Sequence, residues 1–599
     1  MAVSRSHLRN GLILARVLVH QASDDPIHLI IQGSRRVPRA LTRRVGGMLR
    51  LLPGDASQAL AAFLSGEMGR VRHLCGEGLK AESAVGPLTR RVLAEIALEA
   101  GGLQLSPESL PPSTAARACW KRGEMSQALA VLELAGRGRS GLARRLRGEA
   151  LSMDAAYTVP LPELTTRGGA HGAEGRAGGQ EMRAFHVLTN SLPHTQSGYT
   201  LRTHRLLSAL VSRGVRTLAV TRIGYPVLVG IPWGEDVQRI GGVEYRRVLP
   251  LGFGGDLPQR LERQTRAMAA MVREFCPRVL HCTTNYANAL MTDALARAFG
   301  LPWVYEVRGL LEETWASGQA DDGARAAARA SERFTRLRSQ ETRMMERADH
   351  VITLSEVMRR EIIARGIPAE KVSVVPNAVA EGLFGPRRDS AEARQRQGLP
   401  RQGFWVGSIS SLVEYEGFDL LLRAVALTRS QGHDVRVLLV GEGAARAVLE
   451  MLAGELGLED VVVFTGRVAP EQARGFHECL DLFTVPRADV PVARMVTPLK
   501  PIEAMAVGTP VLMSDLPPLR ELAEGAFEQG DEHLVSPGQI SAWADALGAA
   551  AAGRFGERAA RAGRIFAAAR TWEVNAERVE RIYGEVASVH HQQKPWRCP

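Results

Sequence analysis

Short apolar runs alternate with amphipathic stretches of helical period from about residue 182 onward. The first run, RAFHVLTN, is followed by a turn-rich loop, by an amphipathic segment that ends at Gly214, and then by the apolar run VRTLAVTR. RVLHCTT, LPWVYEVRG and ADHVITLS continue the alternation. Because buried strands that alternate with helices form parallel sheets with right-handed crossovers, this pattern predicts a doubly wound α/β domain over residues 182–385.

A second alternation of the same kind covers residues 386–573. Its predicted strands are GFWVGSIS, VRVLLVGEG, VVVFTG, DLFTVPR, TPVLMSD and EHLVSPG. The predicted helices span residues 417–430, 444–457, 470–479, 501–508 and 538–553. Two Rossmann-like domains in tandem leave a cleft between the carboxyl ends of their strands, where sheets of this type bind ligands.

The first 164 residues are rich in Ala, Leu and Arg at helical spacing and predict a helical extension, with His28–Ile31 as the one candidate strand. CWKRGEMSQALAVLELAG resembles one helical hairpin of a tetratricopeptide-like repeat. A single hairpin is not an array, because such repeats bury their faces against neighbours. We therefore favour an irregular helical extension over a repeat domain.

The remaining segments are connections and ends. TTRGGAHGAEGRAGGQ has no apolar periodicity and predicts a glycine-rich linker over residues 165–181. TWEVNAERVERIYGEVA predicts a helix that closes the fold over residues 574–589, and residues 590–599 are expected to be a disordered tail.

The chain is basic, with a formal net charge of +11 and a pI near 9.7. Its 75 Lys and Arg residues are distributed among 64 Asp and Glu residues, and only 5% of residues are aromatic. No aromatic RNA-binding motif or zinc-finger spacing occurs, so we expect no nucleic-acid partner. The densest basic run, from Arg35 to Arg50, contains no acid. It is either a solvated face or a surface attracted to anionic lipid.

Several features favour a cytoplasmic protein. No stretch approaches the roughly 18 uninterrupted apolar residues of a membrane span, and arginines interrupt the N-terminal apolar run, so no signal peptide is expected. The six cysteines include no CxxC pair, which favours thiols in a reducing compartment over disulfides or a zinc site. Residues 1–164 leave two further roles open, peripheral docking at the inner face of the cell membrane and docking onto another protein.

The stretch TPLKPIEAMAVGTPV predicts an anion-binding helix entrance. Pro501 suits the first helical position, which places Lys500 at the cap and Glu503 in the first turn. The N–H groups of Leu499, Lys500, Ile502 and Glu503 are then expected to lack helical partners, at the positive end of the helix dipole. A phosphate fits this entrance, and Glu503 suits a ribose diol one linkage away. A capped core helix with an exposed Lys–Glu pair is the alternative.

This stretch, together with PNAV, LLVGEG and FTGRV at the expected places, resembles the retaining glycosyltransferases of family 4. The resemblance runs from about Phe185 to Tyr583 and does not include residues 1–180. It implies the GT-B architecture, with a sugar nucleotide bound by the C-terminal domain and an acceptor bound mostly by the N-terminal domain. It also implies transfer with retention of configuration, without a metal or other cofactor, and we favour a UDP-sugar over a GDP-sugar as donor.

The resemblance implies roles for individual residues. Glu503 matches the glutamate that holds the donor ribose, and the amides near Leu499 and Lys500 match those that touch the diphosphate. Arg467 lies where the family reads the nucleobase. GSISSLVEYEGFDLL matches the first donor loop, which contains Gly407 and Ser408. The turn GEG at 441–443 is expected to border the donor pocket.

The N-terminal domain supplies a second set of candidates. The loop PHTQSGYTLRT places Gly198, Tyr199 and Arg202 near the reacting sugar or phosphate. His281 ends a strand at the cleft and could orient the sugar or acceptor, although Thr283 is an alternative match to the family's histidine. Glu306 and Arg308 follow at another strand end, where a structural salt bridge is the alternative to a role in the cleft.

Three positions depart from the family pattern. Met495 stands where many members have an acid, eight residues before the ribose-binding glutamate. Ser408 and Glu416 stand where many members have Arg and Lys to neutralise the diphosphate. Other residues must then supply the positive charge, and the candidates are Lys500, Arg202 and Arg487.

The resemblance therefore implies a hexosyl- or glycosyltransferase that uses a hydroxyl acceptor (a glycan, a lipid-linked sugar or a small molecule), and we expect a role in cell-surface polysaccharide or glycoconjugate synthesis. Two alternatives remain, a GT-B sugar-nucleotide epimerase and a non-catalytic scaffold that binds partners through the helical extension.

Overall fold

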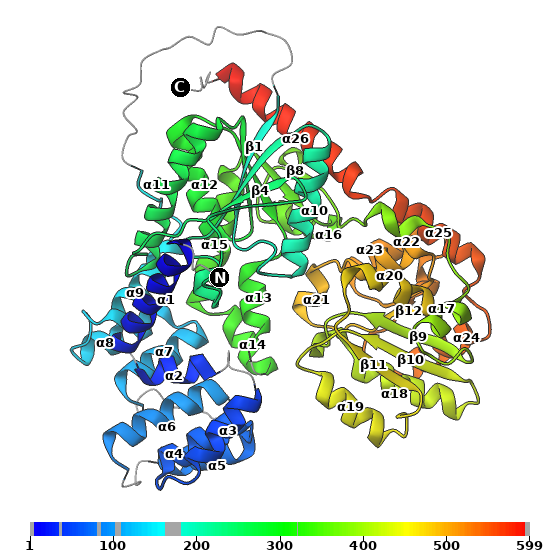
Figure 1. Ribbon diagram of the computed structural model, residues 1–599, viewed down its shortest axis with the longest axis horizontal. Helices are drawn as coiled ribbons and strands as arrows, with labels where there is room; N and C mark the ends of the chain where they lie inside the picture. The colour runs from blue at the N-terminus through cyan, green and yellow to red at the C-terminus, as the bar shows by residue number, and fades with distance from the viewer. Residues whose placement is uncertain are drawn as a thin grey trace.

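Figure 1 shows the computed structural model, which describes residues 5–24, 26–34, 39–80, 85–101, 110–161, 181–319 and 321–593. The N-terminal helices (blue) lie below a first α/β domain (green), and a second α/β domain (yellow to orange) lies beside them. The predicted linker, except residue 181, lies outside the described residues, as do residues 594–599 of the predicted tail.

The N-terminal part is helical, as expected. Its helices are α1 (Arg5–Asp24), α2 (Pro26–Ser34), α3 (Arg39–Leu49), α4 (Asp55–Ser65), α5 (Met68–Gly78), α6 (Pro87–Ala100), α7 (Pro112–Arg122), α8 (Met125–Leu134) and α9 (Gly141–Ser152). The candidate strand His28–Ile31 is wrong, because it lies inside α2. A short apolar run does not distinguish a strand from a helix by periodicity, and Pro26 suits a first helical position.

The helical extension packs directly against the first α/β domain. In α1, the side chain of Asn10 donates to the carbonyl of Gly234 at 2.8 Å, and Ile13 belongs to the core of that domain. In α8, the backbone N–H and the hydroxyl of Ser126 both donate to Glu332, at 2.7 and 2.9 Å. These buried and polar contacts make the extension part of one body with the first α/β domain.

The first α/β domain contains an eight-stranded sheet with the order β3-β4-β2-β1-β5-β6-β7-β8. Its strands are β1 (Arg183–Leu188), β2 (Arg216–Thr221), β3 (Val237–Ile240), β4 (Val243–Arg246), β5 (Val279–Thr283), β6 (Trp303–Val307), β7 (His350–Thr353) and β8 (Val372–Val374). Its helices are α10 (Gly198–Ser212), α11 (Leu257–Phe275), α12 (Tyr286–Phe299), α13 (Leu311–Ser317), α14 (Asp322–Arg329), α15 (Glu332–Arg347) and α16 (Glu356–Ala364). All pairs are parallel except β3 with β4.

The second α/β domain contains a six-stranded parallel sheet with the order β11-β10-β9-β12-β13-β14. Its strands are β9 (Phe404–Ile409), β10 (Val435–Val440), β11 (Val462–Gly466), β12 (Leu482–Val485), β13 (Val511–Ser514) and β14 (Leu534–Val535). Its helices are α17 (Ser390–Arg396), α18 (Phe418–Ser430), α19 (Arg446–Glu455), α20 (Pro470–Cys479), α21 (Pro491–Met495), α22 (Lys500–Val507), α23 (Pro517–Ala526), α24 (Ile540–Ala551) and α25 (Glu557–Ala568). The predicted architecture of two Rossmann-like domains after a helical extension is thus confirmed.

The last helix, α26 (Trp572–Gln593), returns from the second α/β domain to the first (Figure 1). Its buried side chains Trp572, Val579 and Tyr583 lie in one hydrophobic cluster with residues of α10 and of the first sheet. Because this helix continues to residue 593, the predicted tail begins too early at 590.

The chain crosses between the two α/β domains twice, and the two crossings are paired. Val379 forms a parallel β-bridge with Thr571, and its N–H donates to the carbonyl of Arg570 at 2.9 Å. The side chain of Asn575 donates to the carbonyl of Pro376 at 2.7 Å. The two connections therefore form one joined strap between the domains.

The structure bears on two further expectations, the thiol state of the cysteines and the lack of a membrane span. Four cysteines are buried free thiols, as expected: Cys75, Cys119, Cys282 and Cys479. Cys276 is disulfide-bonded, so the expectation of six thiols is wrong at that residue. Within the described ranges, every helix is too short or too polar to cross a membrane.

Candidate active site

The helix entrance predicted from the sequence lies at the start of α22. The helix begins at Lys500, one residue before the predicted start, and Leu499 is its N-cap. The N–H groups of Ile502 and Glu503 donate to the carbonyl of Leu499, at 3.1 and 3.3 Å, so the expectation that they lack partners is wrong. No described residue accepts a hydrogen bond from the N–H of Leu499 or Lys500. Two amides thus remain available to an anion.

Glu416 forms ion pairs with two cations beside this entrance. It accepts two hydrogen bonds from the Arg487 guanidinium, at 2.9 and 3.2 Å, and it lies 3.6 Å from the Lys500 ammonium. Lys500 also contacts the hydroxyl of Ser410. Burial raises the pKa of the Glu416 carboxyl, but Arg487 and Lys500 overcome this effect and hold that pKa below its usual value. Two cations share one carboxylate, which leaves one positive charge for a ligand.

Glycines bring these groups together. Gly417 has a left-handed backbone, and a Cβ there would lie 1.8 Å from the carbonyl oxygen of Pro486. This close approach places Glu416 beside Arg487, the residue after that proline. A Cβ on Gly407 would lie 1.9 Å from the carbonyl oxygen of Leu438 on the next strand. Gly407 is therefore required by the packing of the sheet, which is a different reason from the predicted approach to the donor.

Glu503 faces the other α/β domain. Its carboxylate lies 3.4 Å from a guanidinium nitrogen of Arg205 on α10, and both side chains are partly exposed. The side chain of Asn377 also bridges the domains, donating to the carbonyl of Thr497 at 2.9 Å. The group predicted to hold the donor ribose is thus engaged by a cation of the other α/β domain.

Tyr199 and Gly198 lie at the start of α10, and both are exposed, as a cleft position requires. The hydroxyl oxygen of Tyr199 lies 3.3 Å from the position that a Cβ on Gly309 would take. Burial raises the pKa of the Tyr415 hydroxyl, and Glu416 and Tyr199 contribute to the same shift. Tyr199 thus lies beside Gly309, the residue that follows Arg308.

Arg467 is exposed and lines a cavity of about 610 Å³ in the second α/β domain. The other lining residues are Glu442, Gly443, Ala444, Arg446, Ala447 and Glu450. The structure thus brings Arg467 next to the turn at 441–443, as the donor-pocket prediction requires. Ser408, in contrast, is buried on β9.

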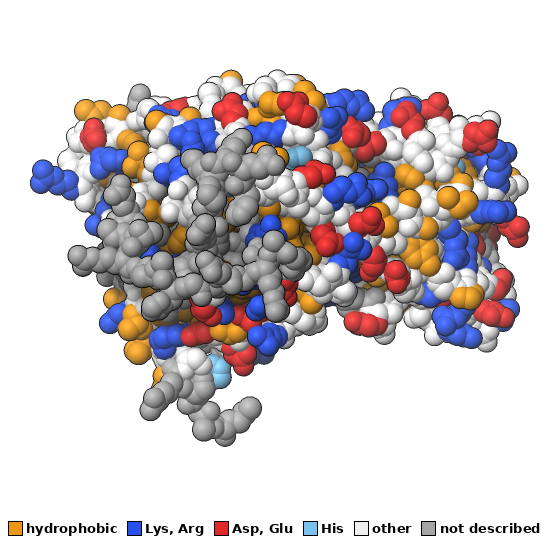
Figure 2. All heavy atoms as spheres, turned by 90° about the horizontal axis from the view of Figure 1, so that it is seen from above, with side chains coloured by type: hydrophobic (Ala, Val, Ile, Leu, Met, Phe, Trp, Pro, Cys, Tyr) orange, Lys and Arg blue, Asp and Glu red, His pale blue; other side chains and the backbone are white. Residues whose placement is uncertain are grey.

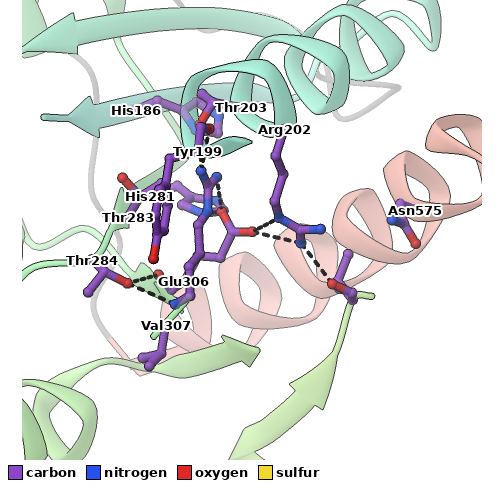
Figure 3. Close-up of polar contacts among 12 residues, drawn as sticks. His186, Tyr199, Arg202, Thr203, His281, Thr283, Thr284, Glu306, Val307 and Asn575 are labelled. Atoms are coloured by element: carbon purple, nitrogen blue, oxygen red, sulfur yellow. Dashed lines mark hydrogen bonds and ion pairs between the residues drawn. The ribbon is translucent and has the colours of Figure 1, made fainter. Parts of the chain in front are cut away.

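A buried ion cluster lies under the start of α10 (Figure 3). Glu306, only 1% exposed, accepts from Arg202 at 2.9 Å and also contacts the Arg308 guanidinium. Arg202 donates further to the carbonyls of Val375 and Pro376, at 2.7 and 2.9 Å. This burial contradicts the predicted contact of Arg202 with the reacting sugar or phosphate. For Glu306 and Arg308, the structure has the salt bridge that was the alternative.

His281 is 1% exposed and belongs to the same cluster. Its Nδ1 lies 2.6 Å from the Tyr583 hydroxyl, its Nε2 lies 3.4 Å from Glu306, and its ring stacks on His186. The predicted contact of His281 with sugar or acceptor is thus contradicted, because protein groups surround the ring. Thr283, the alternative, is also buried. The cluster fixes the strand ends on which the cleft is built.

Met495 ends α21 and packs against the core cluster of the first α/β domain. At this position an acid would lie in an apolar contact between domains, which costs free energy unless it is paired. The departure from the family pattern therefore has a packing reason.

Three functional candidates were not selected from the sequence: Arg205, Ser410 and Asn377. Arg205 lies two helical turns after Gly198 on the same helix, so its position on the cleft face could have been read from helical spacing. Ser410 lies in the predicted donor loop, where it was given no role. Asn377 lies in the PNAV motif, but its contact with a residue 120 positions away could not be read from the sequence.

Both α/β domains match models of known families. A model of the glycosyl transferase 4-like domain matches residues 197–378, and a model of glycosyl transferases group 1 matches residues 401–552. Each match falls on one of the two α/β domains, and together they span more than half of the chain. The chain belongs to glycosyltransferase family 4. Neither match reaches the helical extension of this family 4 protein.

Solved structures agree with a GT-B fold for this family 4 protein. Sucrose-phosphate synthase from Thermosynechococcus elongatus has a TM-score of 0.54 at 22% identity and covers 68% of this chain and all of its own. Anabaena HepE in complex with UDP has a TM-score of 0.51 at 19% identity and covers 67% of this chain and all of its own. At these identities the likeness shows the fold.

Curated relatives are similar over different lengths. The D-inositol 3-phosphate glycosyltransferase of Corynebacterium jeikeium is 26% identical over 436 residues, which are 69% of this chain and 97% of the relative. That of Nocardia farcinica is 32% identical over 219 residues, which are 35% of this chain and 46% of the relative. The 2-deoxystreptamine glucosyltransferase of Streptomyces kanamyceticus is 30% identical over 204 residues, 33% of this chain and 50% of the relative. The chain thus spans about half the length of two of these relatives and nearly all of the third.

Proposed function

We propose that this protein is a retaining glycosyltransferase that moves a sugar from a nucleoside diphosphate sugar to a hydroxyl acceptor. The observation that carries the proposal is the pair of cations, Lys500 and Arg487, gathered by Glu416 at the entrance of α22. Such a pair supplies the positive charge that a leaving diphosphate needs. We expect no metal requirement, because these side chains and the free amides of Leu499 and Lys500 can supply the positive charge that the leaving diphosphate needs.

We infer that the sugar is transferred directly to the acceptor, because no evident glycosyl nucleophile lies among the candidate site residues that the structure describes. The acceptor hydroxyl attacks the anomeric carbon on the face from which the diphosphate leaves. The bond from that carbon to the phosphate oxygen breaks, and the leaving oxygen takes the proton of the acceptor. The main task of the protein is to stabilise the growing negative charge, while closure of the domains excludes water that would hydrolyse the donor.

We favour UDP over GDP as the carrier, with Glu503 on the ribose diol and the cavity beside Arg467 for the base. HepE, which shares the fold, was solved with UDP. The names of the curated relatives include D-inositol 3-phosphate and 2-deoxystreptamine. For this chain we propose a hydroxyl acceptor in cell-surface polysaccharide or glycoconjugate synthesis.

The donor proposal is tested by thermal shift and calorimetry with UDP, GDP and their glucose conjugates. A ligand that binds the folded state raises the melting temperature, so UDP compounds should do so at lower concentration than GDP compounds. Incubation of the best donor with and without candidate acceptors, followed by NMR of the product, then separates transfer from epimerisation. A product with inverted configuration, or turnover of the sugar without any acceptor, contradicts the proposal.

Replacement of Arg205 by Ala is expected to tighten UDP binding. Arg205 engages Glu503, so a ribose must displace it before the carboxylate can accept the diol. Partly exposed ion pairs contribute about 0.2–1 kcal/mol, which corresponds to a dissociation constant up to about fivefold lower. Calorimetry with UDP measures this effect.

Arg213→Ala is the matched control for that measurement. Arg213 follows α10, which carries Arg205, and pairs with Glu580 at 2.7 Å, away from Glu503. Its replacement should leave UDP affinity unchanged. Weaker binding by the Arg205 variant would show that this guanidinium attracts the diphosphate instead of competing with it.

A further inference from the structure

Exposed apolar side chains are concentrated at the N-terminal end of the helical extension. Of 25 large hydrophobic side chains that the structure shows exposed, ten lie between Leu8 and Leu52. This segment is less than a tenth of the chain, so its exposed apolar surface is far above the share expected from its length. Exposed apolar surface gathered in this way marks an interaction site.

Five of these exposed side chains lie on α3 or directly after it. Leu41, Val45 and Met48 are 51%, 36% and 62% exposed, and helical geometry places them within about 60° of one another around the axis. Leu51 and Leu52, directly after the helix, are 84% and 52% exposed. We call these five side chains the α3 stripe.

A neighbouring face of α3 is occupied. Thr42 and Gly46 are buried, and a Cβ on Gly46 would lie 2.8 Å from the hydroxyl of Ser65 on α4. The helix therefore has a fixed orientation, with one side packed on its neighbour and the α3 stripe turned outward. An apolar side that faces away from the protein core marks a surface for a partner from outside the molecule.

The charge around the α3 stripe is positive. Residues 39–52 contain four arginines and no acid. Arg43 and Arg44 on α3 are exposed, and no described carboxylate forms an ion pair with them, whereas Arg50 pairs with Glu67. On the face of the molecule in Figure 2, by contrast, basic and acidic side chains are interspersed. The partner of α3 should therefore combine an apolar interior with a negative surface.

We propose that α3 docks the protein on a membrane that contains anionic lipid. The α3 stripe enters the boundary between headgroups and acyl chains, where Arg44, beside the stripe on the helix, binds a lipid phosphate and the charge of Arg43 adds to the attraction. A second copy of this chain fits less well, because a symmetric contact through the same surface would bring these arginines against their own copies. The proposal does not depend on glycosyl transfer, since vesicle binding is measured without donor or acceptor.

The experiment is co-sedimentation of the full-length protein with two kinds of vesicle, pure phosphatidylcholine and three parts phosphatidylcholine to one part phosphatidylglycerol. We expect binding to the anionic vesicles, weakened by added salt, and little binding to the neutral ones. Arg43→Gln with Arg44→Gln should weaken binding about 30-fold, and Leu41→Ser with Met48→Ser at least about tenfold. All of these positions are exposed, so unchanged circular dichroism and UDP affinity are expected.

The matched control is Val448→Ser with Met451→Ser on α19, two side chains that are 59% and 63% exposed on the second α/β domain. This variant should bind vesicles as the wild type does. The proposal is overturned if both kinds of vesicle bind equally, if neither binds, or if the α3 variants lose no more than the control. It is also overturned if the α3 variants change the oligomeric state measured by light scattering and leave vesicle binding intact.

Discussion

Lys500→Ala is expected to lower turnover about 100-fold while the protein remains folded. The ammonium stands at the entrance of α22 within 3.6 Å of Glu416, where the leaving diphosphate is expected to gather negative charge. Removal of one such charge stabiliser costs roughly 3 kcal/mol in the transition state. Steady-state kinetics with the donor found by calorimetry measures the change, and circular dichroism reports the fold.

Controls separate the role of Lys500 from general loss of charge. Lys80→Ala removes another lysine that is paired with a glutamate, Glu77, on the helical extension, and it should leave turnover unchanged. Arg487→Gln should lower turnover as Lys500→Ala does. The double variant should lose less than the product of the two single effects, because both cations act through Glu416 on one charge. Near-normal turnover in the Lys500 variant would refute its role.

The pH dependence gives the same test a second readout. Burial lowers the pKa of the Lys500 ammonium, and Glu416 opposes this effect only in part. The charged form is therefore lost at a lower pH than for an ordinary lysine. Turnover should fall on the alkaline side earlier than the lysine reference value of about 10.4 would suggest. The Lys500→Ala variant should lack that alkaline limb.

Glu306→Gln is expected to lower the free energy of unfolding by about 3–5 kcal/mol, the largest effect on stability that we predict. The substitution leaves Arg202 and Arg308 buried without their counter-charge, at side-chain exposures of 4% and 2%. For a domain of this size the loss corresponds to roughly 10 °C in the first melting transition. Differential scanning calorimetry measures it.

Glu244 offers a matched control for Glu306, because it also pairs with two arginines, Arg239 and Arg246. Its side chain is 18% exposed and Arg239 is 76% exposed, so solvent can replace the lost contacts. Glu244→Gln should therefore cost no more than about 1 kcal/mol. An equal loss in both variants would show that burial of the cluster is not what makes Glu306 important.

The pH dependence of stability follows from the sign of the shift at Glu306. Burial raises the pKa of its carboxyl, but Arg308 and Arg202 overcome this and hold the pKa well below its usual value. A depressed carboxyl pKa contributes stability that is present above the unfolded value of about 4.3 and is lost as the pH falls below it. The stability of the Glu306→Gln variant should therefore decline less steeply in acid.

The sequence predicted the parallel sheets because their strands are continuous apolar runs that are buried on both faces. It did not indicate β3 and β4, since these four-residue strands form an antiparallel pair at the sheet edge and are only partly buried. An edge pair carries little of the apolar signal on which strand prediction depends.

Candidate site residues were predicted less evenly than the fold. Lys500 and Glu503 were found because proline and helix-start chemistry act over a few neighbouring residues. Arg202 and His281 were assigned to ligand contact because a single sequence does not reveal burial. The pairing of Glu416 with Arg487 joins residues 71 positions apart, so the compensation for the missing cation becomes visible only when both loops are placed in space.

The joined strap of residues 376–379 and 570–575 limits how the two α/β domains can move. A single connection would act as a swivel and would permit rotation in any direction. Two connections that are held together by the bridge of Val379 to Thr571 act as a door hinge, with one favoured axis. Opening should therefore swing Arg205 away from Glu503 along a fixed arc, and each closure should return the two walls of the cleft to the same alignment.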